Sequence, residues 1–96
     1  MSSGPEIEAL RLEIDAIDAR IVALIGERFA CTDKVGHLKC IHQLPAVDTA
    51  REVRQMARFE TLAREHGVAP ELIQRVFRLI VDEVVDKHKQ FGASAD

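Results

Sequence analysis

A heptad pattern of apolar residues runs without interruption through the N-terminal part of the chain and constrains its fold more than any other feature. The a and d positions hold nine apolar or small residues and one arginine. Such a repeat is typical of a long helix with one face packed against another long helix. We call this face the seam, and it consists of Ile7, Leu10, Ile14, Ile17, Ile21, Leu24, Arg28, Cys31, Val35 and Leu38.

Breaker residues divide the chain into three helices. Pro45 interrupts the helical pattern after the seam, and Gly67 and Pro70 separate two later patterns. No segment shows the alternation of apolar and polar residues that is typical of a strand. The sequence therefore predicts one all-α domain over residues 1–96, with a long N-terminal helix. The predicted helices cover residues 6–41, 49–66 and 70–91, followed by a disordered tail at 92–96.

The first helix is too long for the two shorter ones to cover. A helix of about 36 residues spans roughly 54 Å, and a chain of 96 residues buries only a modest core unless it pairs with another copy. The second long helix that the seam requires is most simply supplied by a second copy of the chain. We therefore expect a homodimer, in which two copies of the first helix pack antiparallel about a two-fold axis near residue 22.

Composition excludes several classes of partner. The net charge is −3, with 13 basic and 16 acidic residues, so the chain lacks the basic surplus that binds a nucleic-acid backbone. The chain has no long apolar run and no signal peptide, and Cys31 and Cys40 lie too far apart on one predicted helix to bond to each other. We expect no membrane contact and a cytoplasmic location. The four histidines are scattered and show no spacing typical of metal ligands.

Three cationic side chains form the first candidate site. Arg28 occupies a seam position, where a buried guanidinium is costly unless an anion meets it. Lys39 lies roughly 16 Å further along the same face, which leaves room for one small anionic molecule. In the antiparallel dimer, Arg11 of the partner subunit arrives at a level midway between the two. The alternative is an Arg28 that extends into solvent or pairs with Glu27 or Asp33.

The segment AVDTARE, residues 46–52, places two acids and an arginine at the predicted start of the second helix. Thr49 and Glu52 fit a capping box, in which each side chain satisfies a backbone N–H group of the first turn. The acids Asp48 and Glu52 could also recognise the hydroxyl of a ligand. The pattern alone favours the capping box and leaves the second interpretation open.

His88 extends the apolar stripe of the third helix by one turn beyond Val84. A histidine in this position is most often a residue at the edge of the core with one satisfied hydrogen bond. The alternative is a hydrogen-bond donor at the mouth of the cationic pocket. A protonated His88 would be the stronger donor, and this strength would be lost as the pH rises through its titration.

Together these features resemble the all-helical chorismate mutases of the intertwined-dimer class. The resemblance covers nearly the whole chain, and the spacing of the cations and acids agrees with it throughout. The segments that carry it are ALRLEIDAIDARIVALIGER, VGHLK, PAVDTARE and LIQRVFRLIVDEVV.

The resemblance implies the Claisen rearrangement of chorismate to prephenate, without a covalent intermediate, a metal or a cofactor. In this family a chorismate-like dianion lies between the cations, and the arginine that matches Arg11 comes from the other subunit. Lys39 would then donate to the breaking ether oxygen, while Asp48 and Glu52 face the ring hydroxyl. The residues expected to take part in catalysis are Lys39, Arg28 and His88.

Two positions on the third helix depart from the family pattern. Many members carry a small polar residue where this chain has Val84, and Gln or Glu where it has His88. These changes leave two related activities open, an isochorismate-pyruvate lyase and a 4-amino-4-deoxychorismate mutase. The acid pair Asp48 and Glu52 favours a mutase over the lyase. A third hypothesis is a non-catalytic helical dimer, in which Leu could replace Arg28 with a gain in stability.

Overall fold

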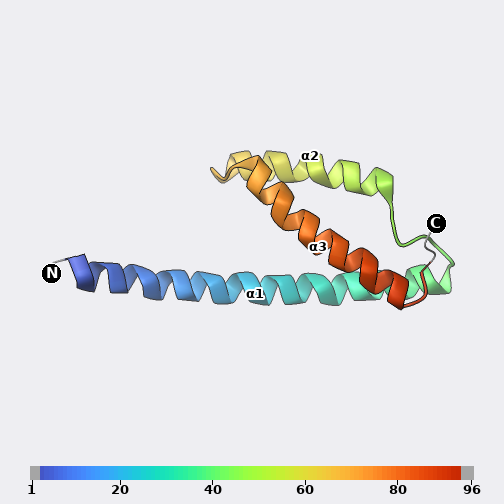
Figure 1. Cartoon of the computed structure of the whole chain (residues 1–96), viewed down its shortest axis with the longest axis horizontal. Helices are drawn as coiled ribbons and strands as arrows, with labels where there is room; N and C mark the ends of the chain where they lie inside the picture. The colour runs from blue at the N-terminus through green and yellow to red at the C-terminus, as the bar shows by residue number, and fades with distance from the viewer. Residues whose placement is uncertain (1–2, 94–96) are drawn as a thin grey trace. The chain divides into compact units, whose positions relative to one another are not determined.

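The computed structural model describes residues 3–93, and these residues form three α-helices and no strand (Figure 1). Helix α1 runs Ser3–Ile41, α2 runs Thr49–Glu65 and α3 runs Pro70–Gln90. The all-α prediction is confirmed. Helix α1 begins earlier than predicted because Gly4 and Pro5 lie in its first turn, where the missing N–H group of proline costs no helical hydrogen bond.

The chain forms two compact units, one ending at Cys31 and one beginning at Thr32. The first unit is the part of α1 up to Cys31. Its apolar seam side chains are 41 to 61% exposed, although they are of the type that proteins bury. An exposed apolar stripe of this kind is typical of interaction surfaces, and its packing against a second copy of the chain stays a prediction. The exposed side chains are Ile7, Leu10, Ile14, Ile17, Ile21 and Leu24.

In the second unit, α2 and α3 form a helical hairpin (Figure 1). Phe59 of α2 stacks on Phe77 of α3, with ring centroids 4.0 Å apart. Ala63 of α2 and Val81 of α3 are buried as well. The hairpin therefore has an apolar core of its own, which holds α2 and α3 together.

The part of α1 that belongs to the second unit packs against the end of α3. Gly36 is buried there, and a Cβ atom added to it would lie 2.5 Å from Cδ2 of His88 and 2.7 Å from Cδ2 of Phe91. The ring of His37 stacks on that of Phe91 with centroids 4.4 Å apart. A side chain at position 36 would keep the two helices from approaching this closely.

All three helices end in the same way, with one residue at positive φ after the last turn. These residues are Gln43 (57°), Gly67 (68°) and Gly92 (105°). After α3, the N–H group of Ala93 donates to the carbonyl of His88 over 2.9 Å, which is the Schellman arrangement. The prediction of a disordered tail is wrong for Gly92 and Ala93, because they cap α3. The rest of that predicted tail, 94–96, lies outside the described residues.

The contact at Gly36 gives a stability prediction. Gly36→Ala should lower the free energy of unfolding by about 1–3 kcal/mol, because the new methyl group overlaps two aromatic rings. Gly26→Ala is the matched control. Gly26 also lies in α1, on the side opposite the seam, with nothing within 4 Å of its Cβ position, so that change should raise stability by about 0.5–1 kcal/mol. Urea unfolding measures both, and equal effects of the two changes would contradict the prediction.

Candidate active site

Lys39 lies in the last turn of α1, and both its main chain and its side chain bind the segment that follows. Its carbonyl accepts from the N–H group of Leu44 over 2.8 Å, and its Nζ donates to the carbonyl of Ala46 over 2.9 Å. Burial lowers the pKa of Lys39 below its usual value of 10.5. Lys39 is therefore a half-buried ammonium group held against the loop that leads into α2.

The charges around Lys39 come from the start of α2. The carboxylates of Asp48 and Glu52 raise the pKa of Lys39 and the guanidinium of Arg51 lowers it, although burial has the larger effect. These groups are close enough to act on one another electrostatically. The structure thus brings together three of the predicted site residues, Lys39, Asp48 and Glu52, and adds Arg51.

Asp48 is the N-cap of α2. Its Oδ1 accepts from the N–H group of Arg51 over 3.0 Å, and its backbone is extended, with φ −121°. The predicted capping box of Thr49 and Glu52 is therefore wrong, because the helix starts one residue earlier than that box requires. Asp is at least as strong a cap as Thr, and here Thr49 is already the first helical residue.

Glu52 turns toward α3 instead of toward its own backbone. Its Oε1 accepts from Nη1 of Arg78 over 3.0 Å, and its side chain is 23% exposed. A groove of about 480 Å³ opens beside this pair. It is lined by Val47, Thr49, Glu52, Val53, Met56 and Arg78. Glu52 therefore presents a carboxylate at the wall of a groove that reaches the loop bound by Lys39.

His88 is buried at the contact between α3 and the end of α1, with 2% of its surface exposed. Its Nε2 lies 2.7 Å from the carbonyl oxygen of Thr32, so Nε2 carries the proton and donates it. Burial lowers the pKa of His88 below 6.5; the bond to Thr32 and the charge of Asp33 raise it, and the charges of Lys39 and Lys87 lower it. These observations favour the interpretation of His88 as a residue at the edge of the core over its interpretation as a charged hydrogen-bond donor at the pocket. A role for His88 in catalysis stays a prediction.

The lowered pKa of His88 predicts how stability depends on pH. Because the folded state disfavours the charged imidazole, the contribution of His88 is complete above its unfolded pKa of 6.5 and is lost as the pH falls through its lower folded pKa. His88→Gln can still donate to Thr32 but does not titrate, so its unfolding midpoint should fall less between pH 7.5 and 5.5 than that of the wild type. Exposed His42→Gln is the control and should follow the wild type. Parallel curves for His88→Gln and the wild type would contradict this expectation.

Arg11 and Arg28 belong to the first unit. Arg11 donates to Oε1 of Glu8 over 2.9 Å, and both side chains are 67% exposed. Arg28 is half-buried. Their convergence with Lys39 around one ligand stays a prediction.

Two cations near the acids were not among the predicted site residues. Arg51 lies inside the segment AVDTARE, so its place beside two acids was a usable signal. Arg78 lies 26 residues after Glu52 and had no such signal, because their contact depends on how α3 packs against α2.

Within residues 3–93, no three side chains of His, Cys, Asp or Glu gather in a way that could hold a metal ion. The expectation of a reaction without metal or cofactor still rests on the sequence alone. Among the described residues, no helix is long and apolar enough to cross a membrane.

The described residues form an all-α fold in which two carboxylates lie near a half-buried lysine, and this cluster is the candidate site. The chain belongs to the chorismate mutase type II family, whose model matches residues 10–89. The resemblance seen in the sequence is thereby confirmed.

Several known proteins are similar to this chain. The bifunctional chorismate mutase/prephenate dehydratase of Escherichia coli (strain K12) is 34% identical over 85 residues, which are 88% of this chain and 22% of that protein. The chorismate mutase of Methanocaldococcus jannaschii is 28% identical over 86 residues, 90% of this chain and 87% of that protein. The 4-amino-4-deoxychorismate mutase of Streptomyces pristinaespiralis is 26% identical over 88 residues, 92% of this chain and 68% of that protein. The chain thus spans 22% of the length of the bifunctional relative.

Proposed function

We propose that this chain is a chorismate mutase, which catalyses the Claisen rearrangement of chorismate to prephenate. The observation that carries the proposal is the half-buried Lys39 beside Asp48 and Glu52, in a chain whose family and relatives bear the name of this activity. The rearrangement needs a folded substrate and stabilisation of the charge that grows on the breaking ether oxygen. A positioned ammonium group supplies that stabilisation without a covalent step.

Each charged residue has a role in this proposal. Lys39 donates to the ether oxygen, and Arg28 and Arg11 bind the two carboxylates of the substrate. Asp48 and Glu52 accept from the ring hydroxyl, so the start of α2 serves both as a helix cap and as a recognition element. In the structure Asp48 makes the cap with one carboxylate oxygen, and a carboxylate can accept several hydrogen bonds.

The proposed enzyme is an intertwined antiparallel homodimer. The exposed seam supports this, because it is continuous and apolar and its heptad spacing fits a second copy of the same helix. An antiparallel pair brings Arg11 of the partner subunit to the level between Arg28 and Lys39. Each dimer then contains two sites, and each site uses both chains. The cytoplasmic location also stays a prediction, consistent with the unpaired Cys31 and Cys40.

A second candidate substrate is 4-amino-4-deoxychorismate, and the relative from Streptomyces pristinaespiralis favours it. The same site would catalyse the same rearrangement, with an amino group in place of the ring hydroxyl.

Product identification tests the proposed function. The purified full chain is incubated separately with chorismate, 4-amino-4-deoxychorismate and isochorismate, and the products are separated by chromatography. We expect prephenate from chorismate. If the chain forms salicylate and pyruvate from isochorismate and no prephenate from chorismate, the proposed function is wrong and the chain is a lyase. No product from any of the three compounds would favour the non-catalytic dimer.

A further inference from the structure

Arg78 of α3 lies between two carboxylates and interacts more closely with one of them. Its Nη1 is 3.0 Å from Oε1 of Glu52 and 3.8 Å from Oδ1 of Asp82. The side chain of Glu52 is 23% exposed and that of Asp82 is 63% exposed, so solvent screens the Asp82 contact more strongly. Arg78 therefore acts mainly on Glu52.

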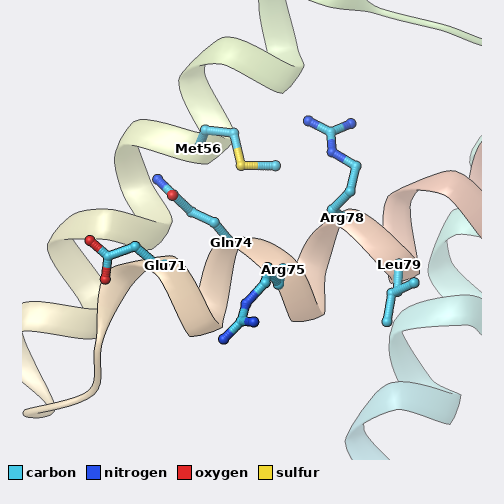
Figure 2. Close-up of a pocket in the computed structure, with 6 residues that line it drawn as sticks. All are labelled: Met56, Glu71, Gln74, Arg75, Arg78 and Leu79. Carbon is cyan, nitrogen blue, oxygen red and sulfur yellow. The ribbon is translucent and has the colours of Figure 1, made fainter.

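The position of Arg78 places its charge at the wall of the groove beside Glu52. Arg78 and Met56 line both that groove and a larger one of about 720 Å³ (Figure 2). The side chain of Arg78 extends to the side of α3 on which Met56 lies, and that of Arg75 extends to the opposite side (Figure 2). A group that binds Glu52 in the groove consequently meets the guanidinium of Arg78 as well.

A carboxylate that is paired with a guanidinium interacts differently with a hydroxyl and with an ammonium group. Glu52 keeps acceptor capacity after bonding Arg78, because an ionised carboxylate has about four acceptor positions. A neutral hydroxyl can donate to it without an electrostatic cost. An ammonium group at the same place gains attraction from Glu52 and loses it again through repulsion by Arg78. Without Arg78, the carboxylate would favour the ammonium group.

We propose that Arg78 is a positioning residue that makes Glu52 select a ring hydroxyl over a ring ammonium group in the substrate. This inference rests on the proposed function and narrows its substrate class. The two compounds that it separates are chorismate and its 4-amino-4-deoxy analogue, whose amine is largely protonated at neutral pH. Arg78 touches Glu52 and not the reacting atoms, so it changes the preference between substrates and not the chemical step.

The test compares kcat/KM for chorismate with kcat/KM for 4-amino-4-deoxychorismate, measured for the full chain at pH 7 and low salt. Arg78→Gln should lower the ratio of the two values by about fivefold, the size that a partly exposed charge pair supports. Arg78→Lys should restore the ratio to within about twofold of the wild type, because a single N–H···O contact needs only a cation. Arg78→Met keeps the apolar stem and replaces Arg78→Gln if that variant fails to fold.

Arg75→Gln is the matched control, since Arg75 lies on the same helix and lines the larger groove with Arg78 but does not line the groove beside Glu52. It should leave the ratio unchanged. Arg78→Gln with lower activity on both substrates but an unchanged ratio would show a structural role alone, overturn the inference and leave the proposed function intact. A wild-type chain that converts neither compound would overturn the proposed function and this inference together.

Discussion

Replacing Lys39 with glutamine should reduce kcat/KM for chorismate by about a hundred- to a thousandfold, the usual cost of losing one donor that stabilises a developing negative charge. Glutamine can still donate to the carbonyl of Ala46, which Lys39 binds over 2.9 Å, so the fold should survive the change. Lys34→Gln is the control, because Lys34 is an exposed lysine on the same helix. Circular dichroism and urea unfolding check the structure of both variants. A Lys39→Gln enzyme within a few-fold of the wild type would remove Lys39 from the chemistry.

The pH dependence of the same residue has a definite sign. Burial lowers the pKa of Lys39, so the charged donor is lost at a lower pH than the usual value of 10.5 would require. Because kcat/KM reports the free enzyme, its alkaline decline should follow this lowered pKa. Lys39→Arg retains a cation that does not titrate in this range and should extend activity to higher pH. An identical alkaline decline in the two proteins would assign that titration to another group.

Mixing two inactive variants should restore activity, which is the second large effect. If each site takes Arg28 from one chain and Arg11 from the other, Arg11→Ala and Arg28→Ala homodimers are both nearly inactive. After joint unfolding and refolding, half of the dimers are mixed and each has one intact site. The mixture should regain about a quarter of wild-type activity.

A third variant makes this experiment specific. Arg28 and Lys39 are proposed to act from the same chain, so a mixture of Arg28→Ala and Lys39→Gln should regain nothing. Analytical ultracentrifugation verifies that dimers form in both mixtures. Equal recovery in the two mixtures, or none from verified mixed dimers of Arg11→Ala and Arg28→Ala, would contradict a site shared in this way.

The sequence predicted the helices well because their signals are local. The heptad pattern and the breakers around Pro45 and Pro70 placed all three helices with small shifts at their ends. The cap of α2 was misplaced by one residue, since Asp48 and Thr49 are both good caps and only the backbone distinguishes them. Gln43 gave no signal for its positive φ, a conformation that glycine usually supplies.

Contacts between helices could not be predicted from local sequence patterns. The bond from Arg78 to Glu52 and the bond from His88 to the Thr32 carbonyl join residues far apart in sequence. Both depend on the angle at which α3 packs, which no local pattern specifies. The grouping of Lys39 with Asp48 and Glu52 was predictable because a short loop joins them and the family resemblance placed them in one site.

The double attachment of Lys39 to the following loop makes the length of that loop important for its evolution and engineering. The carbonyl of Lys39 accepts from the N–H group of Leu44, and its ammonium group donates to the carbonyl of Ala46. These two hydrogen bonds set the number of residues that fits between Lys39 and Asp48. Substitutions of exposed side chains in the loop, such as His42 or Leu44, leave both hydrogen bonds in place. One inserted or deleted residue would displace Asp48 and Glu52 relative to Lys39. Every charged residue of the candidate site would still be present in such a sequence. Among related chains, conserved spacing in this loop should therefore identify a working site better than conserved loop sequence.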